Sequence, residues 1–153
     1  MQKIASFQIN HDTLEKGMYL SRKDGDVITY DIRMKKPNGG EYLNMSAAHT
    51  LEHLLATYLR NGEIGESVVY VGPMGCRTGF YILLRDTVSY QQAIENVRKA
   101  MAFARDFTGE IPGNKKEECG NYLDHDLLGA KREAEQMCNV LKNWTEKDLE
   151  YRL

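Results

Sequence analysis

The spacing of apolar residues along the chain switches between the period of a strand and the period of a helix. Residues 27–34 alternate strictly between apolar and polar side chains, as a strand with one buried face does. Apolar residues at intervals of three and four predict helices over 46–60, 88–107 and 127–143. Weaker patterns predict strands at 18–22, 67–71 and 78–84, a poorly defined strand at 6–11, and a short last helix at 144–153.

Helices and strands are therefore intermixed, and the Lys-Asp-Gly-Asp turn at 23–26 predicts a hairpin between the first two clear strands. The expected fold class is α+β. Because strand 27–34 has one polar face, we expect an antiparallel sheet that helices cover on one side. At 153 residues the chain is expected to form a single domain, 1–153. Arg33 falls on the polar face, where most arginines are solvated and one above a cleft could hold an anionic or polyhydroxylated ligand.

Composition places the chain among ordinary globular proteins, with 42% hydrophobic and 27% charged residues. The formal net charge of −2 gives no electrostatic reason to expect a nucleic acid or an anionic membrane as partner. The first twenty residues lack the apolar stretch of a signal peptide, and no stretch approaches the roughly 20 apolar residues that span a bilayer. We therefore expect a cytoplasmic protein.

Helix 46–60 carries the densest candidate chemistry. Ser46 is the expected N-cap, because its hydroxyl can accept from the unpaired N–H groups of the first turn. His49 and His53 are four residues apart, so their rings project from one face, a single turn apart. Glu52 lies within about 100° of both. Two imidazoles and a carboxylate on one strip suit a catalytic divalent metal, with two nitrogen ligands and a base beside an open coordination position.

This arrangement is the inverted zinc motif, His-x-x-Glu-His. The same five residues also have a purely structural interpretation. In that interpretation the helix belongs to the core, hydrogen bonds satisfy both histidines, and Glu52 is solvated. The motif alone leaves both interpretations open.

The three cysteines form an odd set without repeated spacing, which favours free thiols or metal ligation over a disulfide framework. Cys76 follows a Gly-Pro-Met-Gly loop and precedes Arg77, a setting that favours a lowered thiol pKa; a small buried hydrophobe is an equal alternative. Cys119 lies in a polar segment before the last long helix. Cys138 is interpreted as a packing residue, and His11, flanked by Asn10 and Asp12, as a surface histidine in a turn.

Three separated motifs point to one family when they are taken together. They are His-Thr-Leu-Glu-His at 49–53, Gly-Pro-Met-Gly-Cys-Arg-Thr-Gly-Phe-Tyr at 72–81, and Glu-Cys-Gly-Asn-Tyr at 118–122. In this order, in a chain of this length, they resemble S-ribosylhomocysteine lyase, the LuxS family. The similarity covers nearly the whole chain and includes Ser-Phe at 6–7, Tyr-Asp-Ile-Arg at 30–33 and Asp-His-Asp-Leu at 124–127.

The resemblance implies a mononuclear metal site with a LuxS/metallohydrolase-like fold around it. His49, His53 and Cys119 would be the protein ligands, and a water or a substrate oxygen would take the fourth position. The implied metal is Fe²⁺ in the active form, with Zn²⁺ often present after purification. Glu52 matches the family's general acid/base, and Cys76 matches its catalytic thiolate.

The resemblance also implies a shared active site. Ser6, His11 and Arg33 match positions that bind the substrate, which replaces the interpretation of His11 as a plain surface residue. In the family the site forms at a homodimer interface, and the partner subunit contributes the N-terminal residues. The partners implied are therefore a small-molecule substrate and a second copy of the chain.

The implied reaction is the cleavage of S-ribosyl-L-homocysteine. The sugar opens to its aldose, two successive proton shifts move the carbonyl, and β-elimination of the thioether releases L-homocysteine and 4,5-dihydroxy-2,3-pentanedione. A metal can stabilise the enediolates, while Glu52 and the Cys76 thiolate can move the protons without covalent attack. The pentanedione could serve as the autoinducer-2 precursor in quorum sensing, or be a by-product of clearing S-adenosylhomocysteine in the methionine cycle.

The chain departs from the family pattern at two positions. Many members carry an acidic residue six positions before the catalytic cysteine, in a run resembling Asp-Ile-Ser-Pro-Met-Gly-Cys. Here Tyr70 replaces the acidic residue and Gly72 replaces the serine. A carboxylate beside the thiol is therefore not assured, which affects the expected rate and pH optimum rather than the class of reaction.

Two other functions fit the metal motif. An inverted-motif metal-dependent hydrolase or peptidase would take a downstream glutamate as third ligand, for which Glu133 and Glu135 are available, but it leaves Cys76 without a role. A structural zinc module would need a fourth protein ligand, such as Cys76 or His11, to close the coordination sphere.

Overall fold

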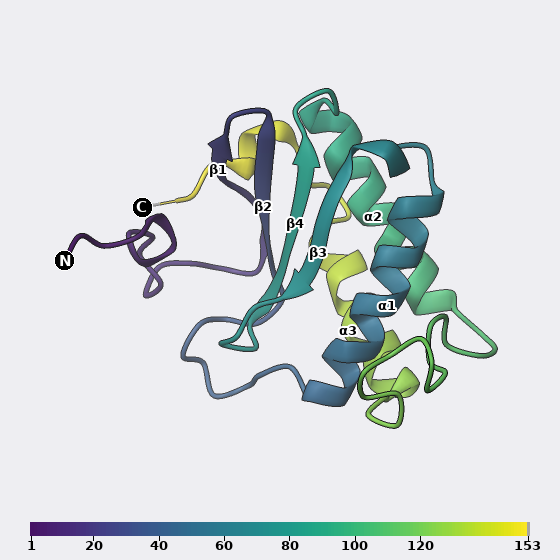
Figure 1. The fold of residues 1–153 in the computed structure, drawn as a ribbon. Coiled ribbons are helices and arrows are strands. Elements are labelled where there is room, and N and C mark those ends of the chain that lie inside the picture. The colour runs from purple at the N-terminus through teal and green to yellow at the C-terminus, as the bar shows by residue number, and fades with distance from the viewer. Residues whose placement is uncertain (153) are drawn as a thin grey trace.

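The computed structural model describes residues 1–152 and shows an α+β architecture in two layers (Figure 1). One layer is a sheet of four strands: β1 (Gly17–Asp24), β2 (Val27–Arg33), β3 (Val68–Pro73) and β4 (Gly79–Arg85). The other layer is made of three helices on one face of the sheet: α1 (Met45–Asn61), α2 (Tyr90–Asp106) and α3 (Leu127–Val140). Short 3₁₀ turns occur at Ala5–Phe7, Gly65–Ser67 and Glu146–Leu149.

The sheet is antiparallel throughout, in the order β1-β2-β4-β3. The predicted hairpin joins β1 to β2, and Gly25 supplies the left-handed φ of +59° that its turn requires. β2 and β4 pair from Val27–Arg85 to Arg33–Gly79. Gly79 cannot carry a side chain, because a Cβ there would lie 2.1 Å from the carbonyl oxygen of Ile32. This close pairing places the end of β2 beside the turn that connects β3 to β4.

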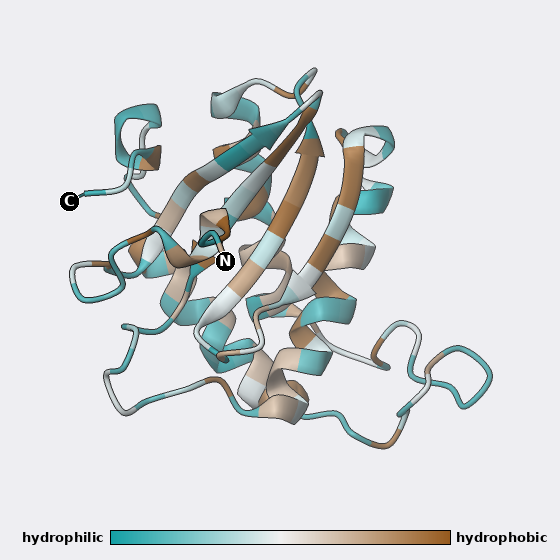
Figure 2. Ribbon diagram, turned by 60° about the vertical axis from the view of Figure 1, so that its left-hand side comes forward, coloured by the Kyte–Doolittle hydropathy of each residue, from teal (hydrophilic) through white to brown (hydrophobic). Residues whose placement is uncertain are grey.

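The core lies between the sheet and the helices, as the periodicity predicts. On β2 the alternate residues Ile28, Tyr30 and Ile32 are at most 3% exposed and face the helix layer. α1 packs against β3 and against both other helices. The hydropathy colouring shows the same arrangement, with long apolar stretches on β3 and β4 and largely hydrophilic loops (Figure 2). Among the helices of the described residues, none has the length and apolar character needed to cross a membrane.

Several predicted details at the ends of the elements are wrong. Residues 6–11 form no strand; the 3₁₀ turn Ala5–Phe7 overlaps their start. β3 continues through Gly72 and Pro73, which were expected in a loop, and the last predicted helix is only the 3₁₀ turn Glu146–Leu149. These segments are short, so tertiary contacts rather than local periodicity decide their conformation.

The cap of α1 also differs from the prediction. The side chain of Asn44 accepts hydrogen bonds from the backbone N–H groups of Ser46 (3.0 Å) and Ala47 (3.2 Å), so Asn44 is the N-cap. Ser46 lies inside the first turn, and its hydroxyl instead donates to a carboxylate oxygen of Asp124. Ser46 therefore fastens α1 to the segment before α3.

Asn44→Ala should lower the free energy of unfolding by about 1 kcal/mol, because two N–H groups of α1 lose their acceptor. Asn44→Asp, which keeps an acceptor at the same place, should stay within a few tenths of the wild-type value. Urea unfolding followed by circular dichroism measures both. If Ser46→Ala lowered the free energy of unfolding by this amount and Asn44→Ala did not lower it, Ser46 rather than Asn44 would be the N-cap.

Candidate metal centre

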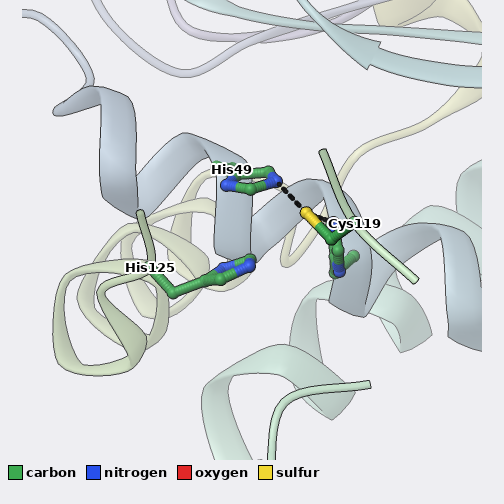
Figure 3. Close-up of side chains that lie close together, drawn as sticks. His49, Cys119 and His125 are labelled. Atoms are coloured by element: carbon green, nitrogen blue, oxygen red, sulfur yellow. Dashed lines mark hydrogen bonds between the residues drawn. The ribbon is translucent and has the colours of Figure 1, made fainter. Parts of the chain in front are cut away.

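Two imidazoles from α1 and one thiol from a loop converge at one point. The ligand loop (residues 107–126), which joins α2 to α3, brings Cys119 against His49 (Figure 3). His53 belongs to the same group. The Sγ atom of Cys119 lies 3.4 Å from Nε2 of His49 and 3.9 Å from Nε2 of His53. In a tetrahedral zinc site, with Zn–N near 2.05 Å and Zn–S near 2.3 Å, such ligand atoms are about 3.5 Å apart. The spacing therefore fits one metal ion bound by all three side chains.

The ligand loop also decides which nitrogen of each imidazole is free. Nδ1 of His49 lies 2.7 Å from the carbonyl oxygen of Asp124, and Nδ1 of His53 lies 2.8 Å from that of Pro112. A carbonyl oxygen can only accept, so both Nδ1 atoms carry the proton and donate it. The lone pair of each Nε2 is left pointing at Cys119. This is the hydrogen-bonding pattern that orients histidines as metal ligands. Because both Nε2 atoms also converge on Cys119, the arrangement favours the metal interpretation over that of two core histidines.

His125 is a functional-site residue that sequence reasoning did not single out. Its ring stacks on that of His49, with 4.0 Å between centroids and 18° between planes. An imidazole lone pair lies in the ring plane, so two nearly parallel rings at this separation cannot both aim at one ion. Burial, then the neighbouring imidazoles, lower the pKa of His125 below its usual value and favour the neutral ring. In this orientation His125 supports the ring of His49 rather than completing the ligand set.

A hydrogen bond fixes the orientation of His125 in turn. Its Nδ1 lies 2.8 Å from the hydroxyl oxygen of Thr50, which is fully buried and accepts from the backbone N–H of Asp126 at 2.9 Å. The hydroxyl proton of Thr50 is thereby free to point at His125. The sequence signal for this contact was present but unspecific, since residues 124–127 entered the family resemblance without an assigned role.

Glu52 lines a cavity beside the metal ligands, as the helical spacing predicts. The cavity has a volume of about 540 Å³, and its lining includes Glu52, His49, Met74, Arg77 and Asn121. The carboxylate is thus on the side from which a small molecule can reach the metal centre. A base next to an open coordination position is the arrangement that proton transfer at a metal-bound substrate requires.

Cys76 lies at the edge of this cavity and is not one of its lining residues. Both of its neighbours, Gly75 and Arg77, line the cavity, whereas the exposed Cys76 places its Sγ atom 3.0 Å from the hydroxyl oxygen of Thr78. The guanidinium of Arg77, expected beside the thiol, lies over the ring of Tyr42 at 5.7 Å from its centroid.

Arg33 is buried, and the expectation of a solvated arginine is wrong. Its side chain is 2% exposed and pairs with the fully buried carboxylate of Asp31, with an Nη2–Oδ2 distance of 2.6 Å. Burial alone would lower the pKa of Arg33, but its hydrogen bonds to Asp31 outweigh that effect and raise the pKa, so the side chain stays charged. A partner carboxylate is what permits the burial.

Ser6 and His11 are not brought to the metal ligands within one chain. Ser6 lines a second cavity of about 320 Å³ on the face of the sheet opposite the helices, together with Tyr70 and Tyr81. His11 uses Nδ1 in a 2.8 Å contact with the carbonyl oxygen of Ile9. In Figure 1 the N-terminal segment lies beyond β1, on the other side of the sheet from α1 and the ligand loop.

The two departures from the family pattern are coupled in space. The ring of Tyr70 lies over Gly72, so a Cβ at position 72 would be 2.1 Å from the Tyr70 hydroxyl oxygen. A serine at 72 would require Tyr70 to move. Tyr70 itself is 51% exposed on the open face of the sheet, and it places no carboxylate near the thiol.

The remaining candidates have structural explanations. Cys138 packs against the core, and burial raises the pKa of its thiol. Glu133, a possible third ligand for a hydrolase, forms an ion pair with Lys35 at 3.0 Å instead. Glu135 is exposed on α3. These contacts do not favour the hydrolase alternative.

Comparisons with known proteins agree with this site. The model of the S-ribosylhomocysteinase (LuxS) family matches residues 4–148. The chain is 47% identical to an S-ribosylhomocysteine lyase of Clostridium acetobutylicum over 156 aligned residues, covering 99% of both chains. It is 46% identical to proteins of the same description from Phocaeicola vulgatus and Porphyromonas gingivalis, covering 99% of this chain and 98% and 99% of theirs.

Gly113→Ala should weaken metal binding about tenfold, because a Cβ at this position would lie 3.1 Å from Nδ1 of His53 and disturb its bond to the carbonyl of Pro112. Gly109→Ala is the matched control. Both glycines have a positive φ, +71° and +104°, but a Cβ at 109 meets nothing within 4 Å. Competition with a chelator for Zn²⁺ measures the affinity. Equal losses in the two variants would show that backbone strain, rather than the orientation of His53, controls binding.

Proposed function

This chain belongs to the S-ribosylhomocysteinase (LuxS) family, and from that membership we propose that it cleaves S-ribosyl-L-homocysteine at the metal centre described above. Its activity is that of a carbon–sulfur lyase, which releases L-homocysteine and 4,5-dihydroxy-2,3-pentanedione. The observation that carries the assignment is the convergence of His49, His53 and Cys119 beside the cavity that Glu52 lines. We propose that the domain spans 1–153, and the family match over 4–148 supports this extent.

We assign the proton transfers to two side chains. Glu52 faces the cavity, where its carboxylate can remove a proton from one sugar carbon and return it to the next. Cys76 would act as the second base from the edge of the same cavity, since its neighbours on both sides line it. A divalent metal, when bound by His49, His53 and Cys119, supplies the Lewis acid that polarises the sugar carbonyl.

Fe²⁺ is the proposed metal of the active enzyme, with Zn²⁺ able to take its place. Two imidazoles and one thiolate form a donor set that suits either ion, and three protein ligands leave a position open for substrate. The three free cysteines support a reducing compartment, and we propose that the enzyme works in the cytoplasm. There the pentanedione would become the precursor of autoinducer-2, and homocysteine would return to the methionine cycle.

A homodimer with a shared site is the proposed working form. Ser6, His11 and Arg33 are the proposed substrate-binding residues, and the partner subunit would supply the N-terminal pair. Two observations support this arrangement. The N-terminal segment lies apart from α1 and the ligand loop of its own chain (Figure 1). On the sheet face that the helices leave open, exposed Tyr70 lines one cavity with exposed Ile4, and Phe7 of the same N-terminal segment is also exposed.

Release of free thiol from S-ribosylhomocysteine tests the function directly. Protein purified without oxygen and loaded with Fe²⁺ should release homocysteine, detected with a thiol reagent. Glu52→Gln and Cys76→Ala should each lower the rate by at least 10²-fold, because each removes a proton-transfer group. Both should keep the wild-type metal content, since neither residue is a proposed ligand. A folded, metal-loaded wild type that releases no thiol would overturn the assignment.

Mixed dimers test the shared site. A double variant, Ser6→Ala with His11→Ala, and the single variant Glu52→Gln should each be nearly inactive alone. After unfolding and refolding together, about half of the dimers should be mixed, and each should contain one intact site made from the unaltered half of either chain. Activity should then recover to about a quarter of the wild-type value per site. Continued inactivity of the mixture, with mixed dimers shown by mass spectrometry, would place all site residues on one chain.

A further inference from the structure

Five side chains form a continuous series of contacts that ends at the thiol of Cys76. At its inner end, the hydroxyl of Tyr151 donates to Oδ2 of Asp31 at 2.7 Å. Asp31 in turn accepts two hydrogen bonds from Arg33, at 3.1 Å from Nε and 2.6 Å from Nη2. Burial, then the charge of Asp31, raise the pKa of Tyr151, so its phenol stays protonated and must donate. These contacts hold the guanidinium of Arg33 in one orientation.

The outer half of the series passes through a single hydroxyl. Nη1 of Arg33 lies 2.8 Å from Oγ1 of Thr78, and the same oxygen lies 3.0 Å from Sγ of Cys76. A guanidinium has donors only, so Oγ1 of Thr78 accepts from it. The hydroxyl proton of Thr78 is then free for a sulfur, and the Sδ atom of Met74 is farther away, at 4.0 Å. The hydroxyl can therefore donate to a Cys76 thiolate at 3.0 Å, the nearer of the two sulfurs, whereas a neutral Cys76 thiol can instead donate to the same oxygen.

The backbone holds Thr78 in this bridging position. Its carbonyl oxygen accepts from the N–H groups of Met34 (2.8 Å) and Lys35 (2.9 Å), directly after β2. Arg77, between the two bridged residues, adopts a left-handed φ of +61°, and its carbonyl accepts from the N–H of Leu43 at 2.8 Å. A left-handed residue other than glycine is uncommon and is maintained only by such surrounding contacts.

The direction of the bonds distinguishes the two forms of Cys76. A thiolate can accept the Thr78 proton in a charge-assisted hydrogen bond, which is about twice as strong as a neutral one. A neutral thiol offers only a weak S–H donor to the same oxygen. Arg33 and Tyr81 are the titratable groups that interact with the charge of Cys76, while the guanidinium of neighbouring Arg77 lies over the ring of Tyr42. Arg33 is linked to the sulfur by two successive hydrogen bonds, one from its Nη1 to Oγ1 of Thr78 and one between that oxygen and Sγ of Cys76.

We propose that Thr78 is a positioning residue that stabilises the thiolate of Cys76 by relaying the orientation and charge of Arg33. Arg33 would then contribute to the reaction through Thr78 and Cys76, whatever contact it makes with substrate. The inference rests on the proposed role of Cys76 as a base. It assigns a function to a threonine that is 2% exposed and is not one of the residues that line the cavity.

Alkylation of Cys76 in the metal-loaded protein tests the relay without substrate. Iodoacetamide reacts with thiolates, so the rate between pH 5.5 and 9.5, measured on the Cys76 peptide by mass spectrometry, follows the thiolate population. Thr78→Val keeps the shape and removes the hydroxyl, and we expect about tenfold slower alkylation at pH 6.5 with the midpoint of the profile moved upward. Thr78→Ser, which restores the hydroxyl, should stay within about twofold of wild type. Cys138 provides an internal control, because its rate should be the same in every variant.

Two outcomes would overturn the proposal. One is a pH profile of Cys76 alkylation in Thr78→Val that matches the wild type. The other is an alkylation rate in Thr78→Ser as low as that in Thr78→Val, which would show that the packing of the side chain, and not its hydroxyl, controls the reactivity of Cys76. Thr78→Ala is the second hydroxyl-free variant if Thr78→Val does not fold, and the same tenfold loss is expected of it. In thiol release, Thr78→Val should lower kcat with little change in KM. An inactive wild type with the expected alkylation pattern would refute the proposed function and leave the relay standing.

Discussion

The docking of the ligand loop onto α1 is the interaction on which the site depends. An α-helix by itself places His49 and His53 on one face but leaves their rings free to rotate. The loop removes that freedom, because the carbonyls of Asp124 and Pro112 bind the two Nδ1 atoms and turn both Nε2 lone pairs toward Cys119. The same loop supplies the thiol. One segment therefore provides the third candidate ligand and the orientation of the other two.

A second constraint acts at the opposite edge of the cavity, where charge is buried. Arg33 could not remain charged at 2% exposure without the carboxylate of Asp31. Their pairing fixes the end of β2, and the tight contact of Gly79 with Ile32 brings the turn before β4 against it. Cys76 is thereby held near a buried cation although it is itself exposed. Metal ligands and thiol thus belong to two separately stabilised structures that meet at one cavity.

The same contacts explain which parts of the fold could be predicted. β2 and α1 are long and strongly periodic, so their apolar positions identified both the elements and the face that each buries. Segments 6–11 and 144–152 are short and lie near the chain ends, and neither formed the predicted element; position 153 of the second prediction lies outside the described residues. Asn44 and Ser46 are both good capping residues, and only the path of the chain before α1 decides between them.

The sequence by itself determined the candidate chemistry of this protein: the residue types at 49, 52, 53, 76 and 119 and the spacing that puts the first three on one helical strip. It did so because side-chain type and helical period are local properties. Only the tertiary structure decided the stacking of His125 on His49, the burial of Arg33 and the bridge from Arg33 through Thr78 to Cys76. These features join residues that are far apart in the chain. His49 and His125 are 76 positions apart, and Arg33 and Thr78 are 45 positions apart. No local pattern encodes such distances; they follow from the packing of the sheet, the helices and the ligand loop against one another.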